Sequence, residues 1–190
     1  MAKLPHTQAA LQRRELLQEA LLTLMQRKGY AQTTVTDLCR EAGIPRRTFY
    51  HYFDCKEDIL YAVIENMLSE CSLEIMLEFN SGYDALMESL IRNFQYWMGP
   101  ARWKMDLMLD NGLSGDMTRC ALHWLETHHM SVLRRPDMTS KEREIAAMVG
   151  ISGFFTLLIY WRKNDYRETP EEMADFASWI LAKPLFSPLK

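Results

Sequence analysis

The chain has 190 residues and a formal net charge of −3, and 48% of its residues are hydrophobic while 25% are charged. This composition is sufficient for a sizeable core and excludes an intrinsically disordered chain. The charge is unevenly spread, because residues 1–56 carry nine Lys or Arg and five Asp or Glu, whereas residues 57–190 carry thirteen and twenty. A basic N-terminal part joined to an acidic remainder suits contact with a polyanion at one end of the molecule.

Helical periodicity covers nearly the whole chain and no alternating strand pattern is sustained, so we predict an all-α fold of about nine helices. The first helix is expected from about Gln8 to Lys28, and Gly29 ends it. Its inward-facing residues are expected to be Leu16, Leu17, Ala20, Leu24 and Met25.

Two short helices joined by a glycine turn are expected next. Thr34 with Asp37 three residues later resembles a capping box, which predicts the start of a second helix that ends at Ala42. Gly43 permits a sharp turn, and Pro45 suits the first position of a third helix because its missing N–H would have no partner there. This arrangement is typical of a helix-turn-helix, whose second helix lies in the major groove of DNA.

The third helix is predicted to have one aromatic face and one basic face. Phe49 and Phe53 lie four residues apart, so they share a face and can pack on the helix before them. Arg46 and Arg47 lie near the helix N-terminus, where base edges are usually reached, and a bidentate arginine–guanine contact discriminates by about 1–3 kcal/mol. Two arginines on a solvated face are a simpler interpretation, but the order of cap, turn, proline and aromatic residues favours DNA binding. The side chains expected to contact DNA are Thr34, Pro45, Arg46, Arg47, Thr48, Tyr50, His51 and Lys56.

Residues 13–60 resemble the tetracycline-repressor (TetR) family of bacterial transcriptional regulators. The resemblance lies in the Gly-Tyr pair before Thr33, in the turn Ala42-Gly43-Ile44, and in the run from Thr48 to Phe53 that precedes Lys56-Glu57. It covers about a quarter of the chain. It implies a three-helix DNA-binding head, a homodimer, and a larger helical body that usually binds a small molecule.

By position, the resemblance implies phosphate contacts from Thr34, Tyr50, His51 and Lys56, and base contacts from the region Pro45 to Thr48. Arg47 departs from the family, which often has a small residue there, so the operator sequence cannot be taken from relatives. The implied partners are double-stranded DNA with a two-fold symmetric operator, a second copy of the chain, and an unidentified small-molecule effector.

We place a helix-turn-helix DNA-binding domain at residues 1–56 and a helical regulatory and dimerisation domain at residues 57–190. Asp54 with Glu57 is expected to start a fourth helix that continues to about Phe79. Further helices are expected at about 83–98, then to near 109, to about 135, from Thr139 to about 164, and from Thr169 to near 183.

The last two helices are expected to form a dimer interface. A two-fold symmetric operator needs two heads held about 34–36 Å apart, and an isologous bundle of two helices from each subunit would fix that distance. The residues assigned to this interface are Gly150, Gly153, Phe154, Leu157, Trp161, Met173, Phe176, Ala177 and Ile180. The alternative is that the same residues form the core of a single subunit.

The middle of the chain is rich in aromatic and sulfur-containing side chains, which suit a pocket for apolar ligands and equally suit an ordinary core. The pocket candidates are Phe94, Trp97, Trp103, Met105 and Trp124. His123, His128 and His129 have no acidic or cysteine partner at ligand spacing, so we predict neither a metal nor another cofactor.

The four cysteines, Cys39, Cys55, Cys71 and Cys120, show no Cys-x-x-Cys spacing and are expected to be reduced thiols in the cytoplasm. A redox-sensing role for Cys55 or Cys71 is the alternative. No signal peptide is recognised at the N-terminus. The uncharged run Ile145–Trp161 has 17 residues, the lower edge of a membrane span, and we interpret it as a helix at a subunit interface.

These observations predict a homodimeric transcriptional regulator, namely a repressor that a small-molecule effector releases from its operator. A ligand-independent architectural or replication-linked DNA-binding protein with the same head is the alternative. An enzyme or a helical adaptor is the third possibility. The sequence has no Ser-His-Asp set, glycine-rich phosphate loop or paired-carboxylate motif, so we predict that it is not an enzyme.

Overall fold

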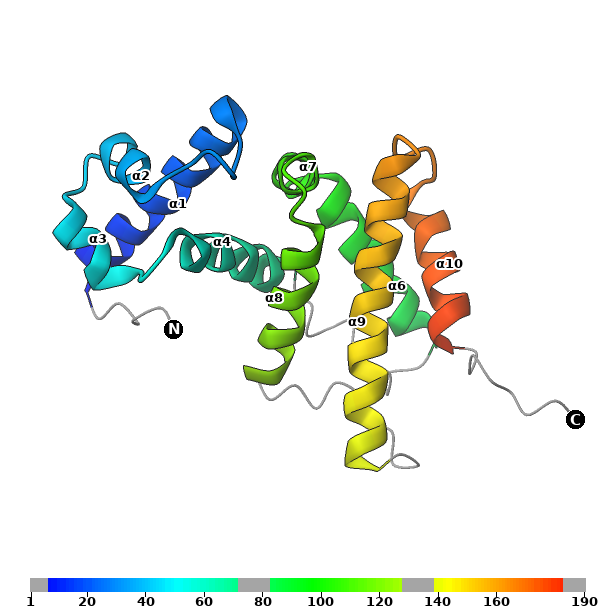
Figure 1. Ribbon diagram of the computed structural model, residues 1–190. Helices are drawn as coiled ribbons and strands as arrows, with labels where there is room; N and C mark the ends of the chain where they lie inside the picture. The colour runs from blue at the N-terminus through cyan, green and yellow to red at the C-terminus, as the bar shows by residue number, and fades with distance from the viewer. Residues whose placement is uncertain (1–6, 72–82, 128–138, 183–190) are drawn as a thin grey trace, which may run out of the picture.

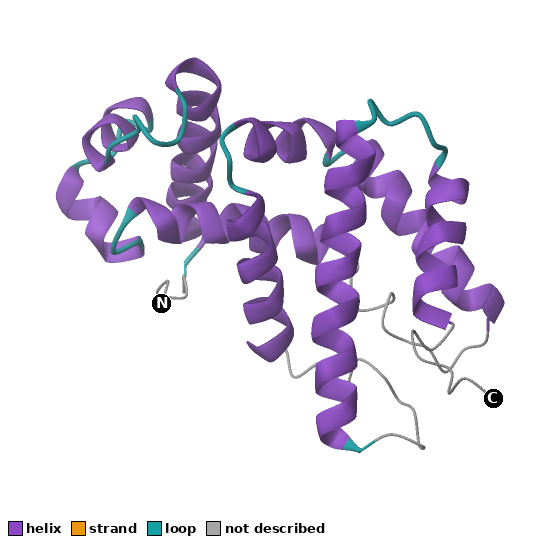
Figure 2. Ribbon diagram, turned by 45° about the vertical axis from the view of Figure 1, so that its right-hand side comes forward, coloured by secondary structure: helices purple, strands orange, loops and turns teal. Residues whose placement is uncertain are grey.

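The computed structural model describes residues 7–71, 83–127 and 139–182. These residues form nine helices and contain no strand, which confirms the predicted all-α fold (Figure 2). The helices are α1 (Gln8–Lys28), α2 (Val35–Glu41), α3 (Arg46–Tyr52), α4 (Lys56–Glu70), α6 (Tyr83–Met98), α7 (Arg102–Asp110), α8 (Ser114–Thr127), α9 (Ser140–Lys163) and α10 (Pro170–Ala182).

The helices divide into a small head and a larger body. Helices α1, α2 and α3 lie together at one end of the molecule, and α4 leads from them to the body formed by α6 to α10 (Figure 1). Helix α4 packs on α1 at the head and on α8 in the body, while α7 lies against both α1 and α6. The buried residues form one continuous cluster through head and body, so the body can fix the position of the head.

Most helix starts follow from local sequence. Thr34 and Thr139 cap α2 and α9 through capping boxes, as predicted from the residue three positions after each. The Thr169 amide donates to the Glu172 carboxylate at 2.8 Å at the start of α10, as the sequence also indicates. These starts are predictable because each cap joins residues that are close in the chain.

Helix α4 starts one residue later than predicted. Its N-cap is Cys55, because the Asp58 carboxylate accepts hydrogen bonds from the Asp54 amide at 2.8 Å and the Cys55 amide at 3.3 Å. The helix ends at Glu70 with Cys71 as its C-cap, and the predicted continuation to Phe79 lies outside the described residues. Likewise α8 ends at Thr127, and its predicted extension to 135 lies outside them.

Leu16 is wrongly predicted to face inward, because 44% of its surface is exposed. The buried stripe of α1 follows Leu17, Leu21 and Leu24, and a neighbour one position away points about 100° from that stripe. The other four residues expected to face inward are buried.

The core of the body is an aromatic cluster shared by α6 and α9. The Phe94 ring centre lies 5.1 Å from that of Phe154 and 5.6 Å from that of Trp161, and Trp97 lies 5.7 Å from Phe155. Such edge-on and tilted ring pairs add to the free energy gained from burying the rings themselves.

This packing corrects part of the predicted dimer interface. Phe154, Trp161, Met173 and Ala177 are at most 2% exposed in the single subunit, so they have almost no surface left for a partner to cover. They belong to the core of the subunit, which was the alternative interpretation. A helix that is apolar on all sides does not reveal from sequence which side its own subunit covers.

The five candidate pocket residues also differ in how far they are buried. Phe94, Trp97, Met105 and Trp124 are buried in the body, whereas Trp103 on α7 is 46% exposed. Trp103 therefore does not line the same interior as the other four.

Helix α9 is long and apolar enough, by length and composition alone, to cross a membrane, and core helices of soluble proteins share this property. Phe154, Phe155 and Leu158 pack into the core of the body. That packing accounts for the apolar character of one side of α9.

Candidate nucleic-acid interface

The turn before α3 places this helix on the outside of the head. Gly43 has a φ of 66°, a left-handed conformation that favours glycine, and the Ile44 amide donates to the Cys39 carbonyl at 2.9 Å. Pro45 is the N-cap of α3 rather than its first helical residue, and its carbonyl accepts from the amides of Thr48 and Phe49. The glycine turn is confirmed, and the helix start differs from the predicted one by a single residue.

Two phenylalanine rings anchor α3 to the head. Phe49 and Phe53 are 0% and 1% exposed, and their ring centres lie 6.2 Å apart. The Arg14 guanidinium of α1 lies 4.6 Å from the centre of the Phe53 ring. Because both rings are buried on one side of α3, the remaining side of the helix must face solvent.

The predicted contact residues of α3 lie on that solvent side. Pro45, Arg46, Arg47, Tyr50 and His51 are exposed and Thr48 is half-buried. The structure thus brings six of the eight predicted DNA contacts onto one short helix and its cap.

Arg46 and Arg47 differ in what holds them. Arg46 donates to the Tyr50 hydroxyl at 3.1 Å and to the Thr36 hydroxyl at 3.5 Å, and the hydrogen bond with Tyr50 raises the pKa of Arg46. Arg47 makes no hydrogen bond or ion pair with any residue that the structure describes. Arg47 can therefore meet a ligand without breaking a hydrogen bond or ion pair within the described residues.

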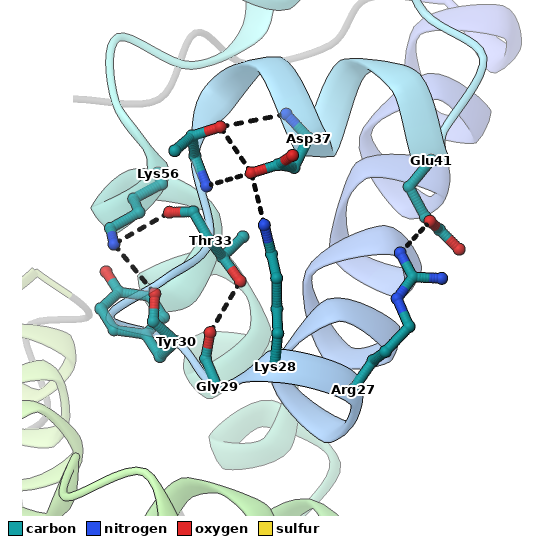
Figure 3. A network of polar contacts seen from close by, with 9 residues as sticks. Arg27, Lys28, Gly29, Tyr30, Thr33, Asp37, Glu41 and Lys56 are labelled. Atoms are coloured by element: carbon teal, nitrogen blue, oxygen red, sulfur yellow. Dashed lines mark hydrogen bonds and ion pairs between the residues drawn. The ribbon is translucent and has the colours of Figure 1, made fainter.

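Thr34, the seventh predicted contact, is exposed at the N-terminus of α2, but its hydroxyl is already engaged. It donates to the Asp37 carboxylate at 2.6 Å and accepts from the Asp37 amide at 3.2 Å. The Lys28 ammonium, 2.6 Å from the same carboxylate, and the Thr34 hydroxyl hold the pKa of Asp37 well below its usual range (Figure 3). The negative charge of Asp37 is thus balanced beside the exposed basic face.

Lys56, the eighth predicted contact, has a structural role that its sequence position did not indicate. Its ammonium donates to the carbonyls of Tyr30 at 3.0 Å and Thr33 at 3.1 Å, and it lies 4.2 Å from the centre of the Tyr30 ring (Figure 3). The first residue of α4 therefore holds the loop between α1 and α2. A phosphate contact from the remaining N–H of Lys56 stays a prediction.

Two ion pairs between α1 and α2 also contribute to the head, and no pattern in the sequence predicts them. Lys28 pairs with Asp37 at 2.6 Å, and Arg27 pairs with Glu41 at 2.7 Å (Figure 3). Their spacings of 9 and 14 residues fit no helical repeat, so the sequence gives no signal for them. Together they join the end of α1 to both ends of α2.

The cysteines are free thiols in the structure, and their surroundings do not favour reactivity. Burial raises the pKa of the Cys71 thiol to about 12 and also raises that of Cys55. A thiol is nucleophilic as the thiolate, so neither residue has the low pKa expected of a redox sensor. Of the histidines considered as metal ligands, His128 and His129 lie outside the described residues.

Comparison with known proteins places the head in a family. Residues 17–63 match the model of the bacterial regulatory proteins of the tetR family. The HTH-type dhaKLM operon transcriptional activator DhaS of Lactococcus lactis subsp. lactis is 32% identical over 82 residues, which are 43% of this chain and 41% of DhaS. The HTH-type transcriptional regulator EthR of Mycolicibacterium smegmatis is 36% identical over 67 residues, 35% of this chain and 27% of EthR. The matched segments thus span less than half the length of both relatives.

The similarity in fold extends through the body. The crystal structure of the multidrug binding protein EbrR complexed with imidazole matches 90% of this chain and 96% of EbrR, with a TM-score of 0.62 and 17% sequence identity. At this identity the likeness concerns the fold. In fold, the chain is a helix-turn-helix head joined to a helical body. Residues 17–63 place the head of this chain in the TetR family of bacterial regulatory proteins.

We predict that Lys56→Met lowers the free energy of unfolding by about 1–3 kcal/mol, because two loop carbonyls lose a charged donor. Lys28→Met is the matched control, since its ammonium takes part in a more exposed ion pair that contributes about 0–1 kcal/mol. Urea denaturation followed by circular dichroism measures both. Equal losses in the two variants would contradict the bracing role of Lys56.

Proposed function

We propose that the protein is a homodimeric, sequence-specific DNA-binding regulator that represses transcription until a small molecule releases it. The observation that supports DNA binding most strongly is the two-sided construction of α3. Burial of Phe49 and Phe53 leaves Arg46, Arg47 and Tyr50 on one exposed face of a helix that belongs to a TetR-family head.

The chemistry of that face suggests separate roles for its residues. Arginine can form a bidentate contact with O6 and N7 of guanine in the major groove. Arg47 has no hydrogen bond or ion pair to give up among the described residues, so it is our first candidate for base recognition. Tyr50, His51 and Lys56 carry donors suited to phosphate oxygens, which position the protein on the duplex.

The pairing of two subunits is supported by a second exposed surface. Ten large apolar side chains among the described residues are exposed, and six of them lie on α9 and α10. We call these six the apolar face: Ile145, Met148, Val149, Tyr160, Phe176 and Trp179, which are 41–63% exposed. An exposed apolar surface of this kind marks an interaction site in a soluble protein.

Four of the predicted interface residues suit this surface. Phe176 belongs to the apolar face, and Gly150 and Leu157 are half-buried on α9. Outside the backbone of its own helix, a Cβ atom added to Gly153 would meet no atom of the described residues within 4 Å, so the helix is open to close approach there. The side chain of Ile180 lies outside the described part of the structure. We assign the interface to the outer side of α9 and α10, where two copies would pack around a two-fold axis.

Dimerisation links the body to DNA recognition. Two copies of α3 must lie about 34–36 Å apart to enter successive major grooves on one side of the duplex. A dimer bound across a promoter blocks access to it, which is the simplest form of repression. An effector releases DNA if it binds more tightly to a body geometry in which the two heads no longer match that spacing.

A buried polar stripe on α6 supports an effector site in the body. Ser89, Asn93 and Trp97 follow one another at intervals of four residues and are buried in apolar surroundings. The Cys71 thiol donates to the Asn93 side-chain oxygen at 2.6 Å, whereas the Ser89 hydroxyl has no hydrogen-bond partner in the described residues. A buried hydroxyl without a partner is costly, and a ligand oxygen or nitrogen would satisfy it. We place the effector beside this stripe, among Phe94, Trp97, Met105 and Trp124.

DNA recognition is tested by selecting duplexes from a random pool with the unmodified protein. We predict that Arg47→Ala loses preference at one position of each half-site, by about 1–3 kcal/mol, because the bidentate contact is removed. Arg27→Ala is the control, since it removes the same charge from the head outside the exposed face of α3. Enrichment of no duplex at low ionic strength would overturn the proposed function, and unchanged preference in Arg47→Ala would remove this residue from base recognition.

Dimerisation is tested by Val149→Glu, which places a charge on the apolar face, where Val149 is 54% exposed. We predict monomers in analytical ultracentrifugation and weak binding to the selected duplex, because an unpaired carboxylate is strongly disfavoured in an apolar interface. Thr23→Glu adds the same charge at an exposed position of α1 and should leave the protein dimeric. A Val149→Glu protein that sediments as a dimer would place the interface elsewhere.

A further inference from the structure

We infer that Asn111 is a positioning residue that fixes the orientation of the DNA-binding head, and that α7 connects the end of α9 to the head through it. This inference rests on the proposed function, because orientation matters only if two heads must match one operator. It is carried by polar contacts along one face of α7 and at its C-cap.

At the head end, the Asn111 side chain is held by hydrogen bonds on both sides. Its Nδ2 donates to the Leu107 carbonyl at 2.8 Å, and its Oδ1 accepts from the Tyr30 backbone amide at 2.6 Å. Asn111 is the C-cap of α7, whereas Tyr30 lies in the loop between α1 and α2, 81 residues earlier in the chain. The contact therefore joins the body directly to the head without passing through α4.

The loop that Asn111 holds is itself rigidly attached to the head. The Thr33 hydroxyl donates to the Gly29 carbonyl at 2.8 Å, and Lys56 donates to the carbonyls of Tyr30 and Thr33 (Figure 3). Gly29 has a φ of 85°, and a Cβ atom there would lie 3.4 Å from the Asn111 Oδ1. Asn111 therefore fits closely against the loop, and a displacement of Asn111 displaces the head.

Along its length, α7 is tied to the C-terminus of α9. Asp106 and Asp110 of α7 both pair with Arg162 in the last turn of α9, and the Arg162 Nε lies 3.3 Å from Asp106 Oδ1. The Tyr166 hydroxyl donates to the same Asp106 oxygen at 2.6 Å. The Arg102 guanidinium lies 4.4 Å from the centre of the Tyr166 ring.

These contacts come from one face of α7 and reach the end of α9 and the turn that follows it. Arg102, Asp106 and Asp110 are spaced by four residues, so they share a helix face. Tyr166 has a φ of 53° and follows Asp165 with a φ of 56°, two non-glycine residues in the left-handed region, which other contacts must hold in place. The end of α9, the helix that carries most of the apolar face, is thus fixed to α7.

The head is held to α4 by apolar packing and by directional contacts, namely the two hydrogen bonds of Lys56 and the Asn66–Gln18 side-chain hydrogen bond at 2.9 Å. The Asn111–Tyr30 hydrogen bond is directional and selects one orientation of the head relative to α7. Without it, the head and α4 can shift together relative to α7, so each single head keeps its affinity for a half-site. The pair of heads loses its preference for one separation of half-sites.

The test compares Asn111→Ala with Asn164→Ala. Asn164 is the C-cap of α9 and donates to the Tyr160 carbonyl at 2.8 Å, which reproduces the local bond of Asn111 to Leu107. Amide hydrogen exchange measured by NMR should become about tenfold faster at Tyr30 in Asn111→Ala, because that amide loses its acceptor. Asn164→Ala should leave Tyr30 exchange unchanged. Unchanged exchange at Tyr30 in Asn111→Ala would overturn the contact.

The second measurement uses a duplex selected by the unmodified protein and variants with base pairs added or removed between the half-sites. The unmodified protein and Asn164→Ala should discriminate strongly between spacings, and Asn111→Ala should discriminate about tenfold less while binding an isolated half-site equally well. Arg162→Met should reduce spacing discrimination without changing Tyr30 exchange, because it breaks the other end of the connection.

The outcomes separate the inference from the proposed function. Faster exchange at Tyr30 with unchanged spacing discrimination in Asn111→Ala would overturn the positioning role alone. Unchanged discrimination in Arg162→Met would overturn the connection to α9. If the unmodified protein selected no duplex, the proposed function and the positioning role would fail together, whereas Tyr30 exchange would still report whether the contact exists.

Discussion

The burial of two phenylalanine rings beneath α3 is the constraint on which the rest of the head depends. A helix of seven residues is too short to be stable alone, so packing must hold it in place. Phe49 and Phe53 provide that packing and at the same time determine which side of the helix is exposed. The basic residues between and before the two phenylalanines therefore face solvent. The chemistry offered to a duplex is therefore a consequence of how the helix is anchored.

A second network, made of hydrogen bonds, allows the body to set the orientation of the head. Lys56 donates hydrogen bonds to two carbonyls of the α1–α2 loop, and Asn111, which belongs to the body, accepts a hydrogen bond from a backbone amide of the same loop. Directional hydrogen bonds define an orientation where apolar contacts alone would allow rotation. The end of α9 is joined to α7, and α7 to the head, by directional polar contacts. Changes in body geometry reach the exposed face of α3 through these contacts, which is the requirement for an effector to act at a distance.

The sequence was most informative where structure depends on neighbouring residues. The cap at Thr34, the turn at Gly43 and the two faces of α3 follow from spacings of a few residues, and the structure confirms them. Contacts between distant segments were not predictable: Asn111 meets Tyr30 across 81 residues, and no periodicity indicates such a pair. The core side of helix α9 could not be predicted from the sequence either, because the helix is apolar on both sides. Only the packing of Phe154 and Trp161 against Phe94 separates its core side from the exposed side.

Contact between the exposed face of α3 and DNA can be measured by hydroxyl-radical footprinting of side chains. Tyr50, His51 and Trp103 are exposed and reactive, and Trp103 lies on α7 in the body. With a selected duplex bound, oxidation of Tyr50 and His51 should fall strongly while that of Trp103 stays at its value in the free protein. A duplex that binds tightly yet leaves Tyr50 and His51 as reactive as before would contradict the account.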